Sequence, residues 1–124
     1  MFEPDACCTL APCFEVQEGQ LPAVKTLVRQ LVERARSESG CLHYAFSFDG
    51  HTAHCREGYV NAEAVLAHLK NVGELVGQLL EKSRLVRLEV HAPAEEVEKL
   101  RAPMAALGAQ FFVLEPGIRR VGAA

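Results

Sequence analysis

The sequence lacks the features that mark a membrane-spanning or exported protein. No apolar run approaches the ~20 residues that a helix needs to cross a bilayer. The opening stretch, MFEPDACCTL, is acidic and has no basic region followed by an apolar one, so we expect no signal peptide and a cytoplasmic location. Positive charge is not in excess either, because the formal net charge is -3. We therefore expect neither nucleic acid nor a membrane surface as a partner.

Cysteine motifs are also missing. The chain has five cysteines, an odd number, and none of them form a C-x-x-C pair. Without a secretory signal we expect reduced thiols rather than a disulfide framework. Glu57 stands close to Cys55 and opposes the cationic surroundings that a nucleophilic thiolate needs. The cysteines are therefore interpreted mainly as small buried hydrophobic side chains.

The 124 residues are the size of one domain, which we expect to span residues 1–124. Strand formers occupy residues 7–17, 41–48, 51–59, 83–93 and 109–117. Apolar residues at helical spacing predict three helices, one between Leu21 and Gly40, one after Asn61, and one from Pro93 to Gly108. The order predicts a ferredoxin-like α+β core, β-α-β-β-α-β, over about residues 7–91, with an α-β extension over residues 92–117.

This order predicts an antiparallel sheet with helices on one face. The other face also needs a cover if it carries apolar residues, and the sheet of a second subunit is a ready cover. Pro12 predicts that the first strand lies at an edge or contains a bulge. Gly73 and Gly77 weaken the middle of the second helix, which could therefore be broken into two pieces.

Three residues of types that bind metals stand together in the stretch FDGHTAHCREGY, as His51, His54 and Cys55. Asp49-Gly50 is a strong signal for a two-residue hairpin turn, so the residues after it should form a strand. Alternation then places His54 on the face opposite to His51 and Cys55, and these two lie roughly 13 Å apart along the strand. The three side chains cannot meet at one ion, and we predict no metal site here.

The same turn predicts the register of the hairpin. With Asp49 and Gly50 as the loop, Phe48 pairs with His51 and Tyr44 pairs with Cys55. A longer or bulged turn would change these pairs. One face then carries Leu42, Tyr44, Phe46, Ala53, Cys55, Glu57 and Tyr59, and the other carries Cys41, His43, Ala45, Ser47, Thr52, His54 and Arg56.

The polar face of the hairpin is a secondary candidate site. It brings together His43, His54 and Arg56. Two imidazoles within cross-strand reach could bind an acidic group, move a proton, or hold a metal with a third ligand from elsewhere. Alternatively, these residues hydrogen-bond within a subunit interface or face solvent.

The aromatic face is the primary candidate site. It gathers Tyr44, Phe46, Cys55, Glu57 and Tyr59, and His68 lies on the apolar stripe of the following helix, which faces the sheet. An imidazole, two phenols and a carboxylate over an apolar floor would suit a small aromatic ligand. Glu57 in such a place would have a raised pKa and could act as a base. Alternatively, Glu57 pairs with a nearby cation and His68 is a hydrogen-bonded core histidine.

Two stretches resemble the antibiotic biosynthesis monooxygenase-like proteins. ESGCLHYAFSF, residues 38–48, is similar to the E-x-G-C-x-x-Y opening of the family's second strand. CREGYVNAEAVLAHL, residues 55–69, is similar to the strand and helix that follow, where a glutamate and an aromatic residue precede a helix carrying A-x-x-x-H-L. The matching positions are Glu57, Tyr59, Ala64 and His68, and the resemblance spans roughly residues 10–90.

The resemblance implies a dimeric α/β barrel, in which two ferredoxin-like sheets pack face to face and each has a pocket beneath its own helices. It also implies oxygenases that oxidise anthrones or quinols without a metal or organic cofactor, because the deprotonated substrate itself reacts with O₂. His68 or Glu57 would be the base, and Tyr44 and Tyr59 would orient the substrate. The chain has no Trp, which the haem-degrading branch uses in its pocket, so haem degradation is disfavoured.

We therefore expect a cofactor-independent monooxygenase-like homodimer that acts on a small aromatic, quinol or polyketide-type compound. One alternative is a non-catalytic dimer that binds or senses a small molecule in the same pocket. Another is an accessory dimer whose polar face, with His43, His54 and Arg56, serves only the interface.

Overall fold

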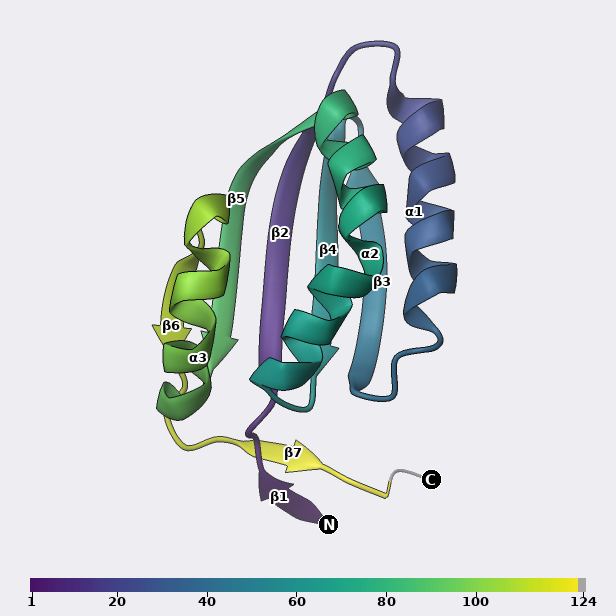
Figure 1. Cartoon of the computed structure of the whole chain (residues 1–124). Helices are drawn as coiled ribbons and strands as arrows, with labels where there is room; N and C mark the ends of the chain where they lie inside the picture. Colours follow the sequence, from purple (N-terminus) through teal and green to yellow (C-terminus); the bar gives the residue numbers. More distant parts are fainter. Residues whose placement is uncertain (123–124) are drawn as a thin grey trace.

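The computed structural model describes residues 1–122 (Figure 1). Five strands form one sheet in the order β3-β4-β2-β5-β6, and α1, α2 and α3 all lie on one face of it. The elements are, in chain order, β1 (Phe2–Pro4), β2 (Cys8–Val16), α1 (Leu21–Ala35), β3 (Cys41–Asp49), β4 (Thr52–Tyr59), α2 (Ala62–Lys82), β5 (Ser83–Ala92), α3 (Ala94–Met104), the 3-10 turn η1 (Ala105–Leu107), β6 (Gln110–Val113) and β7 (Ile118–Arg120).

The βαββαβ core from β2 to β5 has the predicted ferredoxin-like order. The prediction of a purely antiparallel sheet was wrong, because β6 pairs with β5 in parallel. α3 is the reason: a strand that returns through a helix on one face of the sheet runs in the same direction as the strand before it. β1 and β7, which the sequence pattern did not indicate, pair with each other in a separate two-stranded sheet below the main one (Figure 1).

β2 is a central strand, so the edge alternative for Pro12 was wrong. Pro12 is buried opposite Leu88 of β5, and the register with β5 shifts between Cys13 and Phe14. On the other side, β2 pairs with β4 before and after Pro12, but not at Pro12 itself. The sheet therefore accommodates the missing N–H by a gap in one ladder and a nearby bulge.

α2 is one continuous helix, so the predicted break at Gly73 and Gly77 was wrong. Both glycines lie on the solvent face, while Val72, Leu75 and Leu79 on the other face are buried. Tertiary packing of this face outweighs the low helix propensity of two glycines. No helix within residues 1–122 is long and apolar enough to cross a membrane.

The β3–β4 hairpin turns one residue later than predicted. Asp49 pairs with Thr52, so the loop residues are Gly50 and His51, and Tyr44 pairs with Glu57 instead of Cys55. Only Gly50 in this turn has a positive φ, +58°, as in a type II′ turn. Each residue of β3 therefore pairs two residues further along β4 than predicted, and an even shift leaves the two faces as predicted.

The start of β3 departs from this alternation. The register is irregular between Cys41 and His43, which leaves Leu42 exposed and packs Cys41 against the core. The faces assigned to Cys41 and Leu42 were therefore wrong. A bulge of this kind cannot be recognised from alternation, since the extra residue reverses the faces on one side of it.

The exposed glycines of α2 give a prediction about stability. We expect Gly73→Ala and Gly77→Ala each to raise the free energy of unfolding by about 0.5–1 kcal/mol, since a Cβ at either position meets no atom within 4 Å. Urea denaturation measures the change. Gly40→Ala is the contrasting variant, because its Cβ would lie 2.5 Å from the Cβ of Ala64. We expect that variant to be destabilised, and a loss of stability in the α2 variants would contradict the explanation.

Candidate functional site

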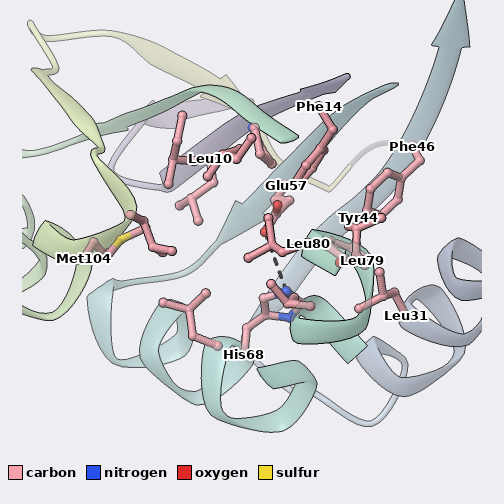
Figure 2. Close-up of a pocket in the computed structure, with 16 residues that line it drawn as sticks. Leu10, Phe14, Leu31, Tyr44, Phe46, Glu57, His68, Leu79, Leu80 and Met104 are labelled. Atoms are coloured by element: carbon pink, nitrogen blue, oxygen red, sulfur yellow. Dashed lines mark ion pairs between the residues drawn. The ribbon is translucent and has the colours of Figure 1, made fainter. Parts of the chain in front are cut away.

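The helix-facing surface of the hairpin positions the candidate acid and base. Tyr44, Glu57 and Leu10 lie side by side on β3, β4 and β2, and their side chains face the helices. His68 lies opposite this row, on the sheet-facing side of α2 (Figure 2). Asn61 caps the start of α2 by accepting a hydrogen bond from the backbone N–H of Ala64, which fixes where the helix begins. His68 and Glu57 are 2% and 5% exposed, so their polar atoms depend on protein partners.

Glu57 has partners on two sides. The hydroxyl of Tyr59 donates a hydrogen bond of 2.6 Å to its Oε1, and Nε2 of His68 lies 3.6 Å from the same oxygen (Figure 2). Burial raises the pKa of Glu57 above its ordinary value, although the Tyr59 hydrogen bond and the charge of His68 act against the rise. Burial is the larger effect, so the site favours the neutral carboxylic acid more than water does.

Glu38, which precedes β3, holds the other side of the imidazole. Nδ1 of His68 lies 2.9 Å from both carboxyl oxygens of Glu38. The side-chain amide of Asn71 donates to Glu38 Oε2 at 2.7 Å and to the backbone carbonyl of Arg34 at 3.2 Å. A carboxylate can only accept, so an ionised Glu38 places the ring proton on Nδ1. Nε2 of the neutral ring then presents a lone pair toward Glu57.

No sequence pattern assigned a role to Glu38 or Asn71. Glu38 lies in the motif ESGC, which indicates the family resemblance but not a contact with His68. Asn71 follows His68 by three residues on α2, so both side chains project from one side of the helix toward Glu38. That spacing was a usable signal, but the loop that brings Glu38 to them is a tertiary feature.

Aromatic rings enclose the imidazole. The ring centroid of His68 lies 4.8 Å from that of Tyr44 and 5.2 Å from that of Tyr59, and Phe46 packs edge-on against Tyr44. Burial and the nearby Glu57 raise the pKa of both tyrosines. The phenols therefore stay neutral near pH 7 and can donate hydrogen bonds. Burial likewise raises the pKa of Cys55, which makes it a poor source of thiolate.

A cavity of about 60 Å³ lies beside this cluster, between α2 and the sheet. Tyr44, Glu57 and His68 supply its polar side chains, and the rest of its lining is apolar. Typical ligand pockets are larger, roughly 300–1,000 Å³. A ligand with a ring system therefore requires the lining side chains to move apart. The remaining lining residues are Leu10, Pro12, Phe14, Leu31, Phe46, Leu69, Val76, Leu79, Leu80, Leu85, Leu88, Met104 and Leu107.

The secondary candidates lie on the opposite face of the sheet and are exposed. His54 pairs with Ser47, which is four residues from His43, so the two imidazoles are separated by roughly 13 Å along the strands. The predicted cross-strand reach between them was therefore wrong. His43 lies over the Cα of Gly58, where a Cβ would collide with its ring. Within residues 1–122, no group of three or more His, Cys, Asp and Glu side chains is arranged to hold a metal ion.

The structure thus places a buried imidazole between two carboxyl groups, in the wall of an apolar cavity. The chain is 41% identical to MupZ from Pseudomonas fluorescens, with a TM-score of 0.89 over 97% of this chain and 99% of MupZ. It therefore belongs to the same family as MupZ, whose fold is shared by structures described as antibiotic biosynthesis monooxygenases.

More distant structures share the fold. Rv0793 from Mycobacterium tuberculosis is 23% identical, with a TM-score of 0.62 over 71% of this chain and 95% of its own. A Chloroflexus aurantiacus protein assigned to the antibiotic biosynthesis monooxygenases is 22% identical, with a TM-score of 0.60 over 72% and 94%. At these identities the likeness shows the fold alone. A scan against protein-family models and a search of curated proteins find no match.

The raised pKa of Glu57 predicts how stability depends on pH. A carboxyl group whose pKa is higher in the folded state contributes most below its unfolded pKa, and this contribution is lost as pH rises through the folded pKa. We expect Glu57→Gln to change stability little at pH 4 and to become stabilising relative to the wild type toward pH 8. The gain should be about 1.4 kcal/mol for each unit by which burial raises the pKa.

Urea denaturation at several pH values measures this difference. Glu74→Gln is the matched control, because Glu74 is exposed on α2. A difference that shrinks as pH rises would mean that Glu57 is ionised and stabilised by His68 instead.

Proposed function

We propose that this protein is a cofactor-independent monooxygenase that acts on a small aromatic, quinol or polyketide-type compound. The observation that carries the proposal is the hydrogen-bonded set Glu38–His68 and Glu57–Tyr59 beside an apolar cavity. A base in such a cavity can turn a weakly acidic C–H or O–H group into an electron-rich anion. That anion can reduce O₂ directly, so the protein's task is to bind, desolvate and deprotonate.

His68 is better suited than Glu57 to be the base. The Nδ1–H group of His68 is held by Glu38, which fixes the tautomer and stabilises the imidazolium that forms when Nε2 takes a proton. Glu57 has a raised pKa and favours its neutral form, so it can donate a hydrogen bond to the anion. Tyr44 flanks the ring and lines the cavity, so it can orient the substrate, whereas Tyr59 is fully buried outside the cavity lining and holds Glu57 through its hydroxyl.

An anthrone illustrates the balance of the reaction. His68 removes a proton from the ring methylene, and the carbanion transfers electrons to O₂. The methylene carbon becomes a carbonyl, one oxygen atom of O₂ becomes the carbonyl oxygen, and the other leaves as water with the two hydrogens. The reaction needs no further reductant.

We also propose a homodimer in which two outer sheet faces pack together. Ala45 and Arg56 are neighbours on this face, and both are exposed. Phe112 of β6 lies on the same face, stacked on His91 with a centroid distance of 4.7 Å. A five-stranded sheet with one face in water is unusual for this architecture, and a second copy is the cover that its symmetry allows. The cavity lies on the helix side and would remain open to ligand in such a dimer.

Oxygen uptake with a panel of anthrones and quinols tests the proposed activity. We expect His68→Ala to lower kcat by about 10²–10⁴-fold, the usual contribution of a positioned general base. Glu57→Gln should lower it less, because glutamine still donates a hydrogen bond. The control Glu74→Gln should leave kcat unchanged.

Other results would point elsewhere. Uptake that survives His68→Ala would contradict His68 as the base. Aromatic ligands that raise the Tm without any uptake would favour a binding or sensing dimer over an oxygenase.

Sedimentation of an outer-face variant tests the dimer. We expect Ala45→Arg to raise the dimer dissociation constant at least about tenfold, because like charges from two copies and Arg56 would meet across the interface. Ala102→Arg, on the exposed side of α3, is the matched control and should not change it. A wild-type protein that sediments as a monomer at every concentration would refute the dimer.

A further inference from the structure

The cavity is polar at one end only. Tyr44 and Glu57 form a pair across β3 and β4, and His68 faces them from α2 (Figure 2). The other lining side chains are aliphatic, aromatic, proline or methionine. A ligand that matches this lining has one polar group and an otherwise apolar body, because a second polar group would be desolvated without a partner.

The apolar part of the cavity follows α2 away from His68. Leu69, Val76 and Leu80 line it, and Leu80 lies twelve residues after His68. At the rise of an α-helix this is about 18 Å of helix axis. The lining therefore reaches well beyond the length of a single aromatic ring, while the cavity volume is only about 60 Å³. A cavity with such a long lining and such a small volume is a narrow slot.

The appended unit supplies the far wall of this slot. A βαββαβ core ends with β5, but Met104 of α3 and Leu107 of η1 line the cavity opposite α2. Figure 2 shows Met104 on the far side of the cavity from Leu31 and Phe46. Leu107 is half-buried and Leu80 is 38% exposed, so this end of the slot approaches the surface.

We infer that the site takes an elongated amphipathic molecule, with an enol or phenol head at His68 and an apolar chain in the slot between α2 and α3. The assignment of the head group rests on the proposed function, since the head is the group that His68 deprotonates. The assignment of the apolar chain rests on the lining of the cavity alone. A flexible chain can fill a narrow slot, whereas a fused ring system has to force α2 and the sheet apart at a cost in packing.

A series of 4-alkylphenols with increasing chain length tests the inference directly. Isothermal titration at one pH gives the dissociation constant of each. We expect the constant to fall by about 3–4-fold for each added methylene while the chain is being buried, and then to level off when the slot is full. Anthrone, which has three fused rings and no chain, should bind more weakly than the best alkylphenol.

Variants at the far end locate the chain. Leu107→Trp and Leu80→Trp should make the affinity level off at a shorter chain, while the constants for the shortest phenols stay unchanged. Leu42→Trp is the matched control, because Leu42 is exposed on β3 and does not line the cavity. Far-ultraviolet circular dichroism and Tm identify any variant that fails to fold, and Leu107→Phe then replaces it.

The two proposals fail separately. The elongated substrate is refuted if the dissociation constant does not depend on chain length. It is also refuted if Leu107→Trp and Leu80→Trp leave the chain-length dependence unchanged. Both results hold whatever the oxygen uptake shows. A chain-length dependence that shifts in these variants supports the elongated ligand. If, in addition, no phenol or anthrone causes O₂ consumption, the proposed oxygenase activity is refuted but the proposed binding mode is not.

Discussion

The burial of one imidazole between two carboxyl groups is the constraint on which the rest of the site depends. His68 is almost fully buried, and its two nitrogens face Glu38 at 2.9 Å and Glu57 at 3.6 Å. Burying such groups without partners would cost several kcal/mol, but within residues 1–122 no buried side-chain nitrogen or oxygen lacks a hydrogen-bond partner. The cluster therefore ties α2 to the loop before β3 and to the end of β4, and fixes the register between helix and sheet.

The two carboxyl groups of this cluster have different environments. Glu38 accepts hydrogen bonds from His68 and Asn71, which suits an anion. Glu57 is more deeply buried, and its pKa is raised. Two similar side chains on either side of one ring thus differ in burial and in hydrogen-bond partners. The arrangement gives the ring a direction, with the proton held on the Glu38 side and the lone pair presented on the Glu57 side.

The sequence predicted which face of the sheet each residue of this site lies on better than it predicted the cross-strand pairs. Strand alternation correctly placed Tyr44, Glu57 and Tyr59 on one side of the hairpin, and helical spacing placed His68 over that side. Both the two-residue period of a strand and the 3.6-residue period of a helix follow from backbone geometry. The turn position was wrong by one residue, yet the faces held because the shift preserved parity. At the bulge beside Leu42 the extra residue reverses the alternation, and there the predicted faces were wrong. The family resemblance placed Glu57 and His68 on matching motifs, and their chemical roles stay predictions.

Other features depend on contacts that no local pattern encodes. The pairing of β1 with β7 joins residues more than a hundred positions apart, and the parallel β6 depends on how α3 packs. Gly73 and Gly77 oppose helix formation locally, but the buried side of α2 outweighs them. Glu38 reaches His68 from a loop whose path is set by the whole α1–β3 connection. The cavity exists only because these elements meet, so its shape could not be inferred from spacing.

The slot and the cluster around His68 share the same buried surroundings. The raised pKa of Glu57 comes mainly from burial, and the strength of the charge interactions around His68 depends on the same dry surroundings. An apolar chain between α2 and α3 would exclude the remaining water from the cavity. Binding energy gained far from the reacting atoms would then strengthen the interactions at the head group, which is how remote parts of a substrate can raise the rate rather than only the affinity. On this view Met104 and Leu107 contribute to chemistry at His68 without touching it.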